Sequence, residues 1–162
     1  MRVLLLAGGV AIAVLAVVIV VGLDLVGEDE PPWSEQASAA CERGIQRARV
    51  VISAGERIAN DEKRALDVYA GATAVEADLI AELDALPRPA DDELAIVRTL
   101  AIVAASHRAD VAAIGRLRRS FDRQLFERRV NDTIPILADV RSRFASLGAA
   151  GCIRFYDPAS YG

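Results

Sequence analysis

Residues 33–86 read WSEQASAACERGIQRARVVISAGERIANDEKRALDVYAGATAVEADLIAELDAL, and this stretch decides the fold. It runs for 54 residues without a proline, and a second proline-free window follows at residues 90–134. In both windows apolar side chains recur at steps of three and four residues, which is the spacing of one helix face. In the first window these residues are Cys41, Ile45, Ala48, Ile52, Ala59, Leu66, Tyr69, Ile80 and Leu83. The sequence therefore predicts long amphipathic helices, with breaks at residues 87–89 and 148–151.

The composition also predicts an all-α fold. The 162 residues are 53% hydrophobic but only 5% aromatic, and the part after residue 28 is rich in alanine and arginine. Alanine favours helices, whereas β-sandwiches and barrels need strands rich in β-branched and aromatic residues. Alanine also fills little volume, so a core with few aromatics buries a modest area per residue. We therefore expect a helical bundle without a deep ligand pocket.

The two cysteines suggest the number of helices, since periodicity alone leaves two, three or four open. A disulfide needs Cα atoms within about 7 Å of each other, and Cys41 opens the first window whereas Cys152 follows the last. Their pairing requires an even number of helices in an antiparallel up-and-down bundle. Four helices fit if the windows turn near residues 60–61 and 120–122. The capping pattern at residues 53–56, and Pro135 shortly after Asn131 and Asp132, offer other turn positions. A single helix over residues 33–86 is the three-helix alternative and would put the cysteines at opposite ends.

Residues 1–27 predict a transmembrane anchor. Residues 3–23 carry no charge over 21 positions, and a helix of that length spans about 31 Å, close to the ~30 Å hydrocarbon core of a bilayer. A cleaved signal peptide is the alternative, but its apolar region is usually shorter. Arg2 precedes the segment and Asp24 follows it, so the positive-inside rule places the N-terminus in the cytoplasm. We expect a single-pass cell-membrane protein whose residues 3–23 contact the lipid bilayer and whose bulk is extracytoplasmic.

The remaining chain divides into a proline-containing linker at residues 28–33, a helical bundle at 34–152 and a C-terminal tail at 153–162. Cys41 and Cys152 bracket the bundle, and an oxidising compartment would let them pair. Such a bond would close a loop of about 110 residues, which the chain-entropy model values at close to 5 kcal/mol. A redox sensor or a bond between two chains is the alternative role for these cysteines.

These features resemble small, N-terminally anchored, Ala- and Arg-rich exported proteins of high-GC Gram-positive bacteria. The resemblance rests on Cys41 early in the first helix, the break at Leu86-Pro87, Asp122 thirty residues before the last cysteine, and the ending LGAAGC at residues 147–152. Pro135 departs from that pattern. The group has no assigned activity, so the resemblance implies an exported helical bundle and no particular chemistry.

Residues that usually carry catalysis are scarce in this chain. His107 is the single histidine and lies in a predicted helix, where a lone histidine is usually a surface or structural residue. The sequence contains no Glu-x-x-His pattern of the di-iron bundles and no Cys-x-x-Cys pattern of zinc or redox sites. It also has neither a glycine-rich dinucleotide loop nor a P-loop. We therefore predict no catalytic residues, no metal and no cofactor.

Six arginines lie between residues 116 and 129, in a chain whose net charge is −4. They are Arg116, Arg118, Arg119, Arg123, Arg128 and Arg129. In a four-helix bundle they flank the third turn, at the end opposite the membrane, and would face an anionic envelope polymer or an acidic protein. A solvated helix face with ion pairs, such as Asp122 with Arg118, is the simpler interpretation. Nucleic acid is not expected as a partner, because the sequence offers no aromatic platform for stacking bases.

Together these patterns predict a membrane-anchored extracytoplasmic bundle that acts by binding or scaffolding in the cell envelope and is not an enzyme. The alternative is a sensory, ligand-binding bundle, since four-helix extracytoplasmic domains resemble the ligand-binding parts of chemoreceptors. Those receptors continue into a second span and a cytoplasmic signalling helix. A sensory role for this chain would therefore need a partner membrane protein.

Overall fold

A computed structural model describes residues 30–56 and 62–161. The predicted anchor at residues 1–27, with its lipid-contacting residues 3–23, lies outside the described residues. Contacts divide the chain into two units, Met1–Pro31 and Pro32–Gly162, and the description below concerns the second. Within the described ranges, no helix combines the length and the apolar character that crossing a bilayer requires.

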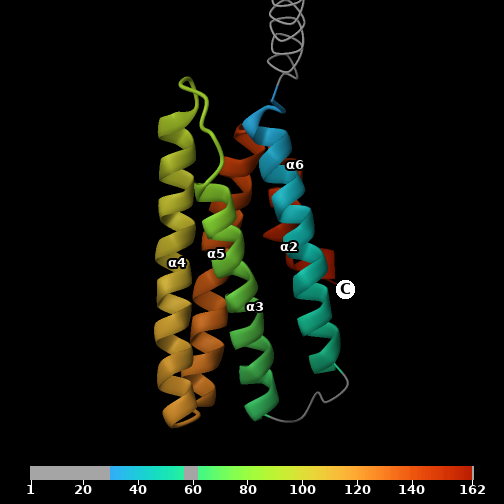
Figure 1. Ribbon diagram of the computed structural model, residues 1–162. Helices are drawn as coiled ribbons and strands as arrows, with labels where there is room; N and C mark the ends of the chain where they lie inside the picture. The colour runs from blue at the N-terminus through green and yellow to red at the C-terminus, as the bar shows by residue number, and fades with distance from the viewer. Residues whose placement is uncertain (1–29, 57–61, 162) are drawn as a thin grey trace, which may run out of the picture. The chain divides into compact units, whose positions relative to one another are not determined.

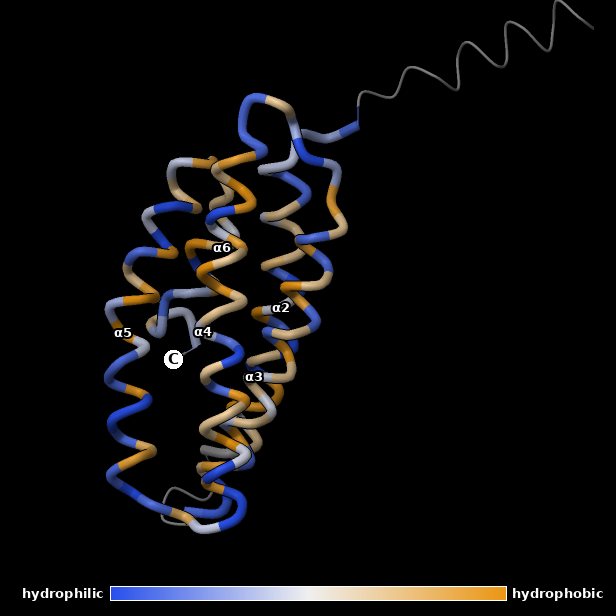
Figure 2. Tube along the Cα trace, turned by 90° about the vertical axis from the view of Figure 1, so that its left-hand side faces the viewer, coloured by the Kyte–Doolittle hydropathy of each residue, from blue (hydrophilic) through white to orange (hydrophobic). Residues whose placement is uncertain are grey.

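Four long helices form an antiparallel bundle (Figure 1). They are α2 (Trp33–Glu56), α3 (Glu62–Asp84), α4 (Glu93–Arg119) and α5 (Arg123–Ser146). Each helix packs against the next along the chain. Apolar positions recur at regular intervals along each of them (Figure 2), as the three- and four-residue spacing predicts. The all-α, four-helix prediction is confirmed. The three-helix alternative is wrong, because residues 33–86 form two helices.

The helix boundaries follow local sequence signals. The break between α2 and α3 falls between Glu56 and Glu62, around the predicted turn, whose residues 60–61 are themselves outside the described ranges. The break between α4 and α5 lies at residues 120–122, as predicted. There the Asp122 carboxylate accepts a hydrogen bond from the backbone N–H of Leu125 at 3.1 Å, which caps α5. Pro135 lies inside α5 and does not start it.

The C-terminal residues complete the bundle. Gly148 takes a left-handed φ of 72° just after α5, a typical helix-ending role for glycine. Two short helices follow, α6 (Ala150–Phe155) and the 3-10 helix η1 (Pro158–Tyr161). The boundary predicted at residue 152 falls inside α6, and Phe155 and Tyr156 are buried. The predicted tail is therefore part of the fold.

Helix α6 lies between α2 and α5 and packs against both, whereas the backbones of α2 and α5 do not approach each other closely in the described part of the chain. The approach of α6 to α2 is so close that a Cβ added to Gly151 would lie 2.2 Å from the carbonyl oxygen of Ser38. Only glycine fits there without a shift of the backbone. Because α6 is short, it closes only part of the space between α2 and α5.

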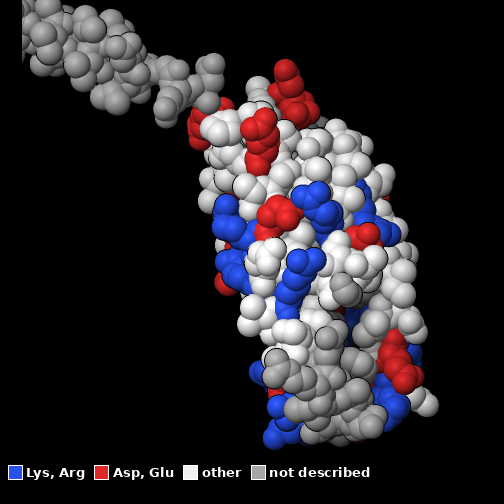
Figure 3. Space-filling model, turned by 90° about the vertical axis from the view of Figure 1, so that its right-hand side faces the viewer, with Lys and Arg blue, Asp and Glu red and all other residues white. Residues whose placement is uncertain are grey.

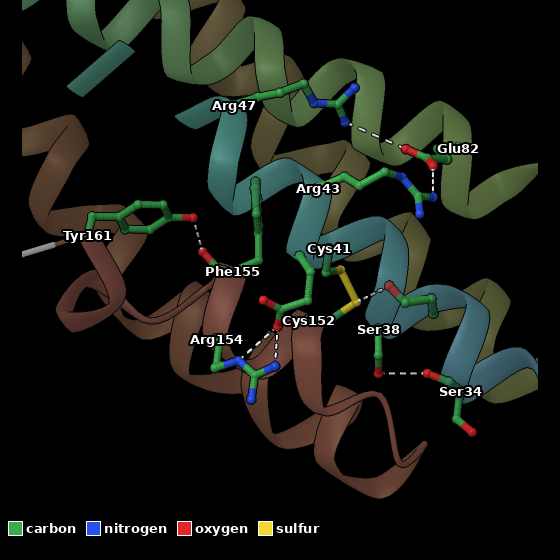
Figure 4. Close-up of a disulfide and its surroundings, with 12 residues drawn as sticks. Ser34, Ser38, Cys41, Arg43, Arg47, Glu82, Cys152, Arg154, Phe155 and Tyr161 are labelled. Carbon is green, nitrogen blue, oxygen red and sulfur yellow. Dashed lines mark hydrogen bonds and ion pairs between the residues drawn. A yellow bond between two sulfur atoms is a disulfide. The ribbon is translucent and has the colours of Figure 1, made fainter. Parts of the chain in front are cut away.

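The disulfide between Cys41 and Cys152 joins α2 to α6, with a Cα–Cα distance of 4.9 Å (Figure 4). Both residues are fully buried in the larger core cluster. Cys41 lies in the first half of α2, and Cys152 lies in α6, which follows the end of α5. Helix α2 begins at the end of the bundle where α5 finishes (Figure 1), so the even number of helices that their pairing required is confirmed. Ion pairs from Arg43 and Arg47 to Glu82 link α2 to α3 beside it.

A second, smaller core cluster occupies the opposite end. It consists of Leu66, Ile114 and Leu117, with Tyr69, Phe121 and Phe126 packed against it. Tyr69 and Phe126 meet edge to face, with ring centroids 5.7 Å apart. The larger cluster includes Phe144 and Tyr156, whose rings stack at 5.7 Å.

Candidate functional site

A cleft of about 460 Å³ reaches into the bundle between the two core clusters. Residues near the end of the chain, among them Phe155 of α6 and Tyr161 of η1, form one side of it. Its wall takes residues from all four long helices and from α6 and η1, and it is mainly apolar. Val130 and Ile134 of α5 line it while remaining exposed. The expectation of no deep pocket is wrong, because it did not anticipate that a short helix would lie between α2 and α5.

Glu76 of α3 is one of two ionisable acidic side chains in the wall of this cleft. Its carboxylate lies 3.3 Å from His107 Nδ1 of α4, and each of these side chains is 17% exposed. Burial removes water from the carboxylate and raises its pKa, an effect that the contact with His107 opposes. The helices therefore hold a poorly solvated acid against an apolar cavity.

Tyr156, the residue that follows α6, lines the same cleft, with only 4% of its surface exposed. Its hydroxyl is buried without a partner at ordinary hydrogen-bond distance among the described residues, and it lies beside the Glu76 carboxylate, with which it interacts. Burial raises the pKa of Tyr156 well above its usual value, and the negative charge of Glu76 raises it further. A phenol directed at a carboxylate can still accept a hydrogen bond through its oxygen, so Tyr156 brings unused acceptor capacity to this wall.

Asp110 of α4 is the other acidic residue of the cleft, and it is held in a network. Arg129 Nε of α5 lies 2.6 Å from its carboxylate, with the two side chains 13% and 9% exposed. The same guanidinium donates to the carbonyl and the hydroxyl of Ser106 at 3.0 and 3.1 Å. The Tyr69 hydroxyl of α3 also donates to Asp110. Three helices are thereby joined across the bundle interior.

The sequence-predicted arginines separate into two groups. Five are exposed near the turn between α4 and α5: Arg116, Arg118, Arg119, Arg123 and Arg128. Of these, Arg123 pairs with Glu62 at 2.7 Å. Asp122 caps α5 with the carboxylate that the simpler interpretation paired with Arg118. Arg129 points into the bundle toward Asp110 and does not belong to the exposed group.

Surface charge is mixed over most of the face shown in Figure 3. Asp and Glu without Lys or Arg lie at the upper end, where α2 begins, while Lys and Arg, interspersed with further Asp and Glu, appear along the middle and at the lower end. The lower end holds the turn between α4 and α5. Across the described ranges, no three His, Cys, Asp or Glu side chains are grouped so as to hold a metal ion.

Comparison with protein-family models, with curated proteins and with solved structures finds no match to this chain.

Proposed function

We propose that this protein binds a small ligand with an apolar body in the cleft between α2 and α5, without catalysing a reaction. The observation that carries the proposal is the cleft itself. A cavity of about 460 Å³ lies within the range of small-molecule sites, which are mostly apolar with a few placed polar groups. Glu76 and Tyr156 are such groups.

Binding of this kind agrees with both functions that the sequence suggests. A bundle anchored by residues 3–23 and exposed outside the membrane could hold an envelope compound, which is a binding role. It could equally report that compound to a partner membrane protein, which is the sensory alternative. The cleft supports ligand binding in either case, and scaffolding alone would not need it.

Filling the cleft tests the proposal. Ala72 of α3 lines the cavity, and we expect Ala72→Phe to weaken binding of an uncharged probe, cyclohexylmethanol, at least tenfold, because the new ring occupies the probe's volume. The measurement is calorimetric titration of the full-length protein in nonionic detergent, with protein-free micelles as the blank.

The matched control for Ala72→Phe is Ala138→Phe, an exposed position of α5 that does not line the cleft. This variant should bind the probe as the unsubstituted protein does. Equal binding by both variants, or no binding by the unsubstituted protein, would reject the cleft as a ligand site.

We propose the five exposed arginines near the turn between α4 and α5 as a second contact surface, for an anionic envelope polymer or an acidic protein. Their exposure supports this role, since clustered surface cations attract polyanions over several ångströms at low salt. Arg129 is left out of this surface because its side chain is only 13% exposed and is bonded to Asp110 inside the bundle.

Charge reversal tests the arginine surface. We expect Arg118→Glu with Arg119→Glu to weaken binding of the full-length protein to dextran sulfate and to polyglutamate at least tenfold at low salt, because two attractive charges become repulsive. Arg98→Glu with Arg108→Glu makes the same change of net charge at exposed positions elsewhere on α4. If both pairs weaken binding equally, net charge alone explains the effect and the surface is not specific.

A further inference from the structure

We propose that the ligand of the cleft carries a protonated amine, which pairs with the Glu76 carboxylate while the apolar body fills the cavity. This inference rests on the proposed function and adds the chemical class of the ligand. Its three supports are the charge of the cleft wall, the acceptors near Glu76 and the way the other acidic residue is neutralised.

The charge of the wall is negative. Among the residues that line the cleft, the acidic or basic ones are Glu76 and Asp110, and both are acidic. Asp110 is balanced by Arg129 at 2.6 Å. The partner of Glu76 is the His107 imidazole at 3.3 Å and not a guanidinium. The cleft wall therefore holds two carboxylates, of which one is paired with an arginine.

Arg49 of α2 lies near the cleft residue Tyr161 and is held by a hydrogen bond. Its guanidinium donates to the carbonyl oxygen of Ser160 in η1 at 2.8 Å. A cation supplied by the ligand would thus meet a carboxylate in a poorly solvated site, where charge–charge attraction is stronger than in water. An anionic ligand would meet repulsion there.

The acceptors near Glu76 suit an amine in particular. A primary ammonium has three N–H donors and no acceptor. Glu76 offers its carboxylate oxygens, and the buried Tyr156 hydroxyl beside it offers an oxygen that can accept even when its own hydrogen is directed at Glu76. A ligand N–H directed at the Tyr156 oxygen would occupy an acceptor position that no described residue fills at ordinary hydrogen-bond distance. The Tyr156 oxygen and the Glu76 carboxylate thus point to the same head group.

Three probes with one apolar body separate this inference from the proposed function: cyclohexylmethylamine, cyclohexylmethanol and cyclohexanecarboxylate. We expect the amine to bind the full-length protein roughly tenfold to a hundredfold more tightly than the alcohol, and the carboxylate to bind more weakly than the alcohol. The titrations are run by calorimetry in nonionic detergent at pH 8, where an alkylamine such as this probe carries its proton.

Glu76→Gln should remove the preference for the amine while leaving the alcohol's affinity within about threefold, which shows that the cleft is intact. Glu127→Gln, at an exposed position of α5 outside the cleft wall, should keep the preference.

Equal binding of amine and alcohol by the unsubstituted protein would overturn the inference while the proposed function stands. Loss of the preference in both variants would show that Glu76 is not its source, and binding of none of the probes would overturn the inference and the function together.

Discussion

Replacing Cys41 and Cys152 together by alanine is expected to lower the free energy of unfolding by about 4 to 5 kcal/mol. The reason lies in the unfolded chain. The bond links residues 111 positions apart, and without it the unfolded chain gains the freedom of a very long loop. Urea unfolding of the full-length protein, followed by the helical circular dichroism signal, measures the change.

Reductant provides the control for the cysteine prediction. It should lower the stability of the unsubstituted protein toward that of the double variant and leave the double variant unchanged. A difference below about 1 kcal/mol between the two proteins would contradict the idea that loop closure stabilises this bundle.

Substituting Arg129 by methionine is expected to cost about 3 to 5 kcal/mol, because it leaves the buried Asp110 carboxylate without its cation. Methionine fills much of the same volume, so the loss reflects charge more than packing. The variant also loses the hydrogen bonds that Arg129 donates to Ser106. Thermal and urea unfolding of the full-length protein measure the effect.

Two comparisons isolate the buried charge at Asp110. Arg128→Met changes the exposed neighbour of Arg129 and should stay within about 0.5 kcal/mol of the unsubstituted protein. Adding Asp110→Asn to Arg129→Met should recover a large part of the lost stability, since no unbalanced charge then remains inside. If Arg129→Met is as stable as Arg128→Met, Arg129 contributes no more to the free energy of unfolding than a surface arginine does.

The helical bundle and its closure could be predicted because their signals are local or simple. Proline-free windows, three- and four-residue spacing and the N-cap residue Asp122 define the helices from neighbouring residues. The disulfide follows from two cysteines at the ends of the domain, with one possible pairing within the chain. Neither the helices nor the disulfide requires us to know which side chains, far apart in the sequence, contact each other in the fold.

The cleft could not be predicted in the same way, because it depends on how α6 separates α2 from α5. One signal was nevertheless present. In α3 the face that includes Leu66, Tyr69 and Ile80 continues through Thr73 and Glu76 at the same three- and four-residue steps. The apolar series omits these two positions because they are polar. A carboxylate on the buried face of a helix is itself a signal of an interior site.

The role of Arg129 could not be predicted from the sequence either. It lies among exposed arginines, and only the packing of α5 against α4 shows that its partner is Asp110. Asp110 falls on the buried face of α4, with Val103 and Ser106 at helical spacing before it. Pairing a buried acid with one particular arginine requires the angle and register of two helices, which periodicity does not provide.

The joining of α2 to α6 sets the order of events in biosynthesis. Cys41 is made early, and its partner is made only after α3, α4 and α5 have been synthesised. The bond can therefore form only on a chain whose four long helices are already complete, and a chain interrupted before α6 would keep a free thiol at Cys41. The oxidised state thus marks finished molecules, and a thiol-reactive label would distinguish them from incomplete ones.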